Sequence, residues 1–233
     1  MLSWQLSQFM HGEQGALLTA SQLVGAVPSL DAKYYASTQA MDEARHVEVF
    51  SRYLREKLEW EWPINPNLKQ LLDLILTDSR WDLKYLGMQI MVEGLAMAAF
   101  ANLYQIAAEP LVKEVIHYVM RDEARHVAFG VLSLRGHYDE MAASERRDRE
   151  DFVVEACLLM RDRLVGEEVA DAMGFDREEV RRIVLDSPIM QMFRQALFAR
   201  VVPNVKRLGL LTPRVRGAFE EMQIIQFEHD DPG

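Results

Sequence analysis

Apolar residues recur at intervals of three and four positions along almost the whole chain, which is the spacing of one face of an α-helix. No segment shows the strict alternation of apolar and polar residues that is typical of a half-buried strand. The pattern predicts an all-α protein. We expect helices at about residues 3–26, 31–60, 66–78, 81–107, 110–138, 143–173, 176–200 and 213–222.

Proline and glycine fall at widely spaced points that separate the expected helices. These breaks are at Pro28, Pro63 with Pro66, Glu109 with Pro110, Gly174, and Pro203. No stretch of the 233 residues resembles a Gly/Ser-rich or Pro-rich linker, so we expect one domain over residues 1–233. Its core bundle should span about 3–138, and C-terminal helices at about 143–222 should cover the bundle or form a homodimer contact.

Charge and composition exclude several classes of protein. A net charge of −10 argues against an extended nucleic-acid surface, and no run of about 18 apolar residues predicts a membrane span. The first residues lack the basic segment and long apolar run of an export signal, so we expect a cytoplasmic protein. Cys157 is the only cysteine and lies in an apolar run, which predicts a buried structural thiol.

The chain contains an internal repeat. The hexapeptide Asp-Glu-Ala-Arg-His-Val at residues 42–47 returns unchanged at 122–127, an offset of 80 (122 − 42). The same offset relates Glu13 to Glu93, and each of these glutamates precedes its Glu-x-x-His by 30 residues (43 − 13 and 123 − 93). The repeated unit is therefore larger than the hexapeptide.

This spacing brings ligands together if each half folds as a helical hairpin. A glutamate and a histidine three residues apart lie on the same face of a helix. The midpoint of each 30-residue interval falls at an expected turn, near Pro28 in the first half and Ala108 in the second. The paired carboxylates then come to the same height. The sequence predicts convergence of Glu13, Glu43, His46, Glu93, Glu123 and His126.

The neighbours of the four glutamates are mainly apolar, so these carboxylates should face the core. Each buried carboxylate costs several kcal/mol without a partner, and no lysine or arginine shares those faces to pair with all four. Two divalent cations would balance the charge. Hard oxygen ligands with one imidazole per metal favour iron, with manganese as the alternative.

The constellation resembles the ferritin-like di-iron carboxylate superfamily, whose helical bundles take one Glu from each of two helices and Glu-x-x-His from two others. The resemblance covers about residues 5–135. The Asp-Glu-x-Arg-His form is most similar to the hydroxylase subunits of bacterial multicomponent monooxygenases. It implies a ferritin-like four-helix bundle with additional C-terminal helices. It also implies that Asp42 supports His126, that Asp122 supports His46, and that Arg45 and Arg125 orient the two aspartates.

Three residues depart from known relatives. Met97 stands where the multicomponent monooxygenases carry a threonine, and Phe50 stands where ribonucleotide reductase small subunits carry a radical tyrosine. Arylamine N-oxygenases have an extra histidine four residues before the second Glu-x-x-His, and this chain has Val119 there. The pattern leaves the particular oxygenase family open.

From the resemblance we expect an oxygenase or oxidase that uses O2 to oxidise a small, apolar organic substrate at two iron ions. The small residues after Glu93 could form a pocket for it, although tight helix packing explains them equally. Without a nucleotide-binding motif or cysteine cluster, the chain needs an external electron donor, a reductase or ferredoxin. The alternatives are a ferroxidase or peroxide scavenger, a manganese/iron reductase-like oxidase, and a metal-free helical interaction protein.

Overall fold

The computed structural model describes residues 2–231, and within that range the chain forms helices and no strand. The all-α class predicted from the sequence is confirmed. The helices of the first half are α1 (Leu2–Ala26), α2 (Leu30–Tyr53), η1 (Leu54–Leu58), α3 (Pro66–Thr77), α4 (Trp81–Tyr85), η2 (Leu86–Val92), α5 (Glu93–Ile106) and α6 (Pro110–Leu134). Those of the second half are α7 (Ala143–Asp162), η3 (Arg163–Val165), α8 (Glu167–Met173), α9 (Arg177–Asp186), α10 (Pro188–Ala196), α11 (Val201–Arg207), α12 (Pro213–Glu221) and η4 (Ile225–His229).

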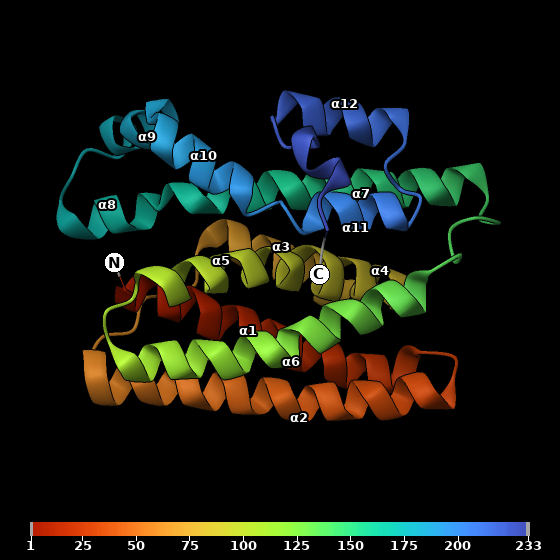
Figure 1. Ribbon diagram of the computed structural model, residues 1–233, viewed down its shortest axis with the longest axis horizontal. Helices are drawn as coiled ribbons and strands as arrows, with labels where there is room; N and C mark the ends of the chain where they lie inside the picture. The colour runs from red at the N-terminus through yellow and green to blue at the C-terminus, as the bar shows by residue number, and fades with distance from the viewer. Residues whose placement is uncertain (1, 232–233) are drawn as a thin grey trace.

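Two helical hairpins form the bundle that carries the repeat. The first pairs α1 with α2, whose N-terminus is capped by the Ser29 hydroxyl, and the second pairs α5 with α6, capped by the Glu109 carboxylate. Pro110 occupies the first turn of α6, where a missing N–H costs no hydrogen bond. In Figure 1, α2 forms the lower edge of the bundle and α6 runs obliquely above it, and the two helices are in contact. Both expected turns therefore lie where the repeat requires them.

The third long helix of the bundle is continuous over Trp81–Ile106 but changes its winding. Leu86–Val92 is π-helical, and the Glu93 N–H donates to the Met88 carbonyl five residues earlier. Such π-segments occur often at functional sites. This helix is long and apolar enough to cross a membrane by composition alone, but 72% of its most apolar window is buried inside the protein, as expected of a core helix.

The C-terminal helices form a second layer above the bundle (Figure 1). Here α7 packs against α3, η2 and α12. The expected single helices at 143–173 and 176–200 were wrong, because Gly166 breaks the first with a φ of +69° and Pro188 begins a new helix within the second. Pro203 was also wrongly expected as a break. It lies in the first turn of α11, where proline is tolerated.

Candidate metal centre

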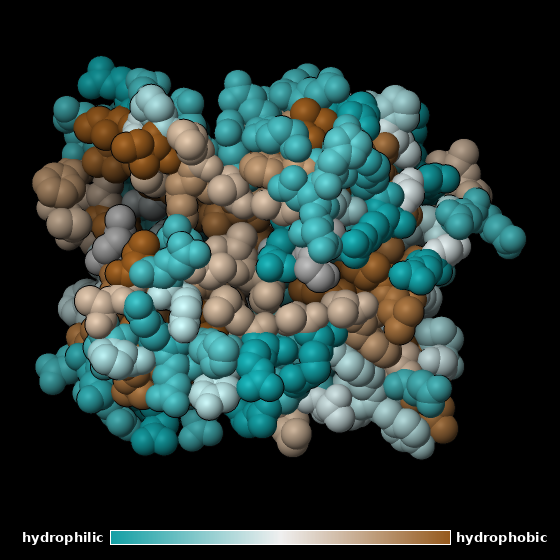
Figure 2. Space-filling model, in the orientation of Figure 1, coloured by the Kyte–Doolittle hydropathy of each residue, from teal (hydrophilic) through white to brown (hydrophobic). Residues whose placement is uncertain are grey.

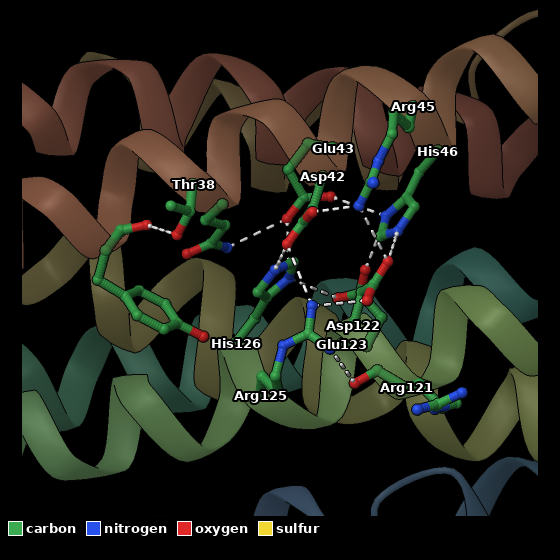
Figure 3. Close-up of polar contacts among 12 residues, drawn as sticks. Thr38, Asp42, Glu43, Arg45, His46, Arg121, Asp122, Glu123, Arg125 and His126 are labelled. Atoms are coloured by element: carbon green, nitrogen blue, oxygen red, sulfur yellow. Dashed lines mark hydrogen bonds and ion pairs between the residues drawn. The ribbon is translucent and has the colours of Figure 1, made fainter.

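The two hexapeptides face each other across the contact between α2 and α6. Figure 3 shows Asp42, Glu43 and His46 on one helix directed toward the matching residues of the other. Glu13 arrives from α1 and Glu93 from the start of α5. The six predicted ligands are at most 6% exposed. The four glutamates therefore face the core, as their apolar neighbours in the sequence predicted.

The six side chains form two overlapping groups. In each group, one potential ligand atom per residue lies within 4.8 Å of the others. Glu43 and Glu123 belong to both groups, so each could help to hold either of two ions. The first group is Glu13, Glu43, His46 and Glu123, and the second is Glu43, Glu93, Glu123 and His126.

Both imidazoles point the same ring nitrogen toward the carboxylates. His46 Nδ1 lies 3.0 Å from Glu123 Oε1, 3.2 Å from Glu43 Oε2 and 3.4 Å from Glu13 Oε2. His126 Nδ1 lies 3.1 Å from Glu43 Oε1 and 3.6 Å from Glu123 Oε2. Each Nδ1 is therefore placed to share a metal ion with the glutamates around it.

The other ring nitrogen of each imidazole meets an aspartate of the opposite hexapeptide. His46 Nε2 lies 3.2 Å from Asp122 Oδ2, and His126 Nε2 lies 3.3 Å from Asp42 Oδ2. An Nε2–H that donates to the aspartate leaves Nδ1 unprotonated and free to bind a metal.

Two arginines tie these aspartates together. Arg45 contacts Asp42 and lies 3.5 Å from Asp122, and Arg125 lies 2.6 Å from Asp122 and 3.4 Å from Asp42. The two arginine side chains are more than half exposed, and their guanidinium groups lie between the two helices (Figure 3). These are the contacts that the family resemblance implied.

Burial and charge perturb the ligands strongly when no ion is bound. Burial, reinforced by repulsion from Glu123, raises the pKa of both Glu13 and Glu93 well above the ordinary range. Burial alone would lower the pKa of His126, but its contacts with Glu123 and Glu43 raise it to about 12. Protons on these groups offset the clustered negative charge. Two divalent ions would take over that role and release the protons.

A second observation also supports the binding of divalent ions by these residues. Among the six candidate ligands, four buried polar atoms have no hydrogen-bond partner within residues 2–231: Glu93 Oε2, Glu123 Oε1 and Oε2, and His126 Nδ1. Buried polar atoms without partners are rare in folded proteins, and each one calls for an explanation. All four belong to the second group of ligands. Coordination of an ion there would satisfy them.

Gln39 belongs to this site, and the sequence reasoning missed it. Its Nε2 donates to Glu43 Oε1 at 3.1 Å and to Glu93 Oε1 at 2.9 Å, and its Oε1 accepts from Gln89 Nε2 at 3.0 Å. Gln39 lies one turn before Glu43 on the same face of α2. The sequence did hold one sign of this role, because Gln39 is a polar residue on a helix face that is otherwise apolar apart from the predicted ligands. The contacts position two of the carboxylates.

The residues that depart from known relatives are all buried beside the centre. Met97 is 7% exposed, Val119 is 2% exposed and Phe50 is fully buried. The other four histidines, His11, His117, His137 and His229, belong to neither ligand group in the described chain. Tyr35 stacks on Phe129 with ring centroids 3.6 Å apart, so its ring packs against α6.

A comparison with known protein families matches residues 22–209 to the family described as P-aminobenzoate N-oxygenase AurF. The match includes five of the six predicted ligands and begins after Glu13. It extends well past residue 135, where the resemblance recognised in the sequence ended, and reaches beyond α11. No individual curated protein matches the chain.

Proposed function

Because the chain belongs to the p-aminobenzoate N-oxygenase AurF family, whose members are di-iron oxygenases, we propose that it oxidises the nitrogen of a small aromatic amine. Membership confirms the ferritin-like superfamily, the oxygenase class and the two-iron cofactor expected from the sequence. Within the oxygenases, the match lies with the N-oxygenases, whereas the hexapeptides resembled the multicomponent monooxygenases.

The observation that carries the proposal is the pair of overlapping, buried carboxylate and histidine groups. We assign Glu13 and His46 to one iron, Glu93 and His126 to the other, and Glu43 and Glu123 to both. When bound, the irons supply the electrons that activate O2 and the oxidising power for the substrate.

The protein residues around these ligands keep the centre in order. Asp42 and Asp122 hold the protons of the two imidazoles on Nε2, so that Nδ1 remains a ligand atom. Gln39 holds Glu43 and Glu93 in place, and the apolar core excludes water from the centre.

The proposed centre has six protein ligands where the arylamine N-oxygenases have a seventh. Val119 lies one turn before Glu123 and offers no ligand atom. The family match shows that this departure does not take the chain out of the family. Bound ions would be held here without a side chain from position 119.

Electrons have to come from a separate protein, a reductase or ferredoxin, because the chain has one cysteine and no nucleotide-binding motif. That cysteine, Cys157, is fully buried in the core, as its apolar neighbours predicted. A cytoplasmic location and a homodimer remain part of the proposal, supported by the lone thiol and by the apolar C-terminal helices.

The test is the reaction of the iron-loaded, reduced protein with 18O2 in the presence and absence of small aromatic amines, beginning with 4-aminobenzoate. We expect an N-oxidised product that carries 18O, identified by mass spectrometry, in the wild type and in the exposed control variant Glu48→Gln. The variant Glu123→Ala should give none. Repeated iron oxidation without any organic product would instead identify a ferroxidase and overturn the proposal.

A further inference from the structure

A cavity of about 140 Å³ lies within the C-terminal layer, and none of the six candidate iron ligands lines it. Its lining comes mainly from α7, α10 and the segment after α12. Two arginines and three glutamines provide its polar groups, and none of the described residues that line it is acidic. Sites for drug-sized molecules have volumes of about 300–1,000 Å³, so this cavity fits a smaller group.

Arg194 lines this cavity from a helix whose exposed side is apolar. It is only 8% exposed, whereas Ile189 and Met192 on the same helix are 78% and 69% exposed. Figure 2 shows apolar side chains at the surface where α9 and α10 lie. An amphipathic surface helix usually has the reverse arrangement, and arginine is almost never buried unless it is paired. The inward position of Arg194 therefore calls for a partner.

The chain itself does not supply that partner. The Arg194 guanidinium forms no hydrogen bond or ion pair with any residue between 2 and 231. Burial, reinforced by repulsion from Arg161, lowers the pKa of Arg194, and attraction to Asp162 offsets only part of this effect. Asp162 already accepts from Arg161 Nε at 2.7 Å and does not line the cavity. Two like charges therefore border a cavity that has no acidic side chain in its lining.

The other lining residues add a hydrogen-bond donor and an apolar wall. Gln195 Nε2 donates to Gln223 Oε1 at 2.9 Å, and this contact leaves the amide nitrogen of Gln223 available as a donor. Phe198 and Ile224, each 1% exposed, form the apolar part of the lining. Charged hydrogen bonds are stronger beside apolar surroundings than in water. The cavity thus combines N–H donors with a surface that favours the pairing of its cations.

We propose that this cavity binds a phosphate group, free or carried by a small phosphomonoester, between Arg194 and Arg161. A phosphomonoester carries about −1.5 to −2 charges at pH 7, and guanidinium groups bind phosphate oxygens through pairs of hydrogen bonds. A monocarboxylate would neutralise only one of the two arginines. The small volume leaves no room for the base and sugar of a nucleotide inside the cavity. This site is separate from the iron centre and does not depend on the proposed oxidation.

A bound phosphate would join two helices of the C-terminal layer. Arg161 belongs to α7 and Arg194 to α10, whose described packing is chiefly against α9. A ligand that pairs with both arginines therefore adds a connection between α10 and α7. We expect phosphate to raise the unfolding temperature of the protein, because a ligand that binds only the folded state stabilises it.

The experiment measures binding by calorimetry to the iron-loaded protein without oxygen, in a buffer free of phosphate. The probes are inorganic phosphate, methyl phosphate and acetate. We expect the wild type to bind at least one of the two phosphates about 10-fold or more tightly than acetate, and the tighter of the two identifies free phosphate or a monoester as the ligand. Arg194→Met should weaken phosphate binding by about 10- to 100-fold, and Arg194→Lys should fall between.

Arg182→Met is the matched control. Arg182 is exposed on the neighbouring helix α9 and does not line the cavity, so phosphate binding should not change. Without phosphate, Arg194→Met should unfold at a temperature no lower than the wild type, because an unpaired buried charge is removed. Phosphate should then raise the unfolding temperature of the wild type and of Arg182→Met, but not that of Arg194→Met.

Three results would overturn the inference. The first is no binding of either phosphate by the wild type. The second is equal phosphate affinity in the wild type and in Arg194→Met, which is also the result if phosphate binds only at the iron centre. The third is acetate binding as tight as phosphate binding. Each result can be obtained whether or not the protein oxidises an amine.

Discussion

Replacing Glu93 with glutamine should stabilise the metal-free protein and weaken the stabilisation that iron provides. Glu93 is 3% exposed, and its Oε1 accepts from Gln39 while its Oε2 has no hydrogen-bond partner among the described residues. Glutamine has the same size and keeps the acceptor for Gln39. Its amide can donate to Glu123, whose carboxylate oxygens contact the two histidines but accept no hydrogen bond, and which lies in the same ligand group.

The magnitude follows from the unsatisfied group. A buried polar atom without a partner costs about 1–3 kcal/mol. For a chain of this length each kcal/mol shifts the unfolding temperature by about 2–4 °C, so the metal-free variant should unfold about 2–12 °C above the wild type. Iron at 100 times its Kd should add about 2.7 kcal/mol per site to the wild type. The variant should gain less, because a neutral amide replaces an ionised ligand.

Scanning calorimetry of both proteins, metal-free and loaded with iron without oxygen, measures the four unfolding temperatures. The exposed α2 variant Glu48→Gln serves as the control and should follow the wild type in both states. The reasoning is refuted if the metal-free Glu93→Gln protein unfolds below the wild type. It is also refuted if iron raises the unfolding temperature of both proteins equally.

Three further substitutions test other parts of the site. Asp42→Asn should weaken iron binding by about 10- to 100-fold, measured by competition with a chelator, because His126 loses the carboxylate 3.3 Å from its Nε2; unchanged affinity would argue against the pairing. Val119→His should add a nitrogen ligand detectable by X-ray absorption of the iron-loaded protein, and an unaltered spectrum would place position 119 out of reach. Gly130→Ala should cost about 1–3 kcal/mol in denaturant unfolding, since its Cβ would lie 2.6 Å from a side-chain carbon of the facing helix; Gly12→Ala, with nothing within 4 Å, should cost nothing.

The ligand cluster could be predicted because, on helices, the spacing of residues along the sequence determines which side chains share a face and at what height they lie. Glu43 and His46 share a face by the helical period, and equal distances from a turn bring Glu13 level with Glu43. The contact of Asp42 with His126 came from the family resemblance, since no spacing rule joins residues 84 apart (126 − 42). The sequence thus located the centre through its repeat.

Features that depend on tertiary packing could not be read from the chain. A single glutamine such as Gln39 carries no motif, and its role follows from bonds to Glu43 and Glu93 on different helices. The π-winding before Glu93 has no sequence signature that separates it from an α-helix. Helix breaks at residues such as Gly166 were hidden in an amphipathic pattern that continues across them.

The central claim is a pair of iron sites built from four glutamates and two histidines. Anomalous diffraction at the iron edge, from crystals loaded with iron without oxygen, tests it most directly. The account predicts two peaks, one in each ligand group, with Glu43 and Glu123 between them. A single peak, no peak, or peaks away from Glu13, Glu43, His46, Glu93, Glu123 and His126 would contradict it.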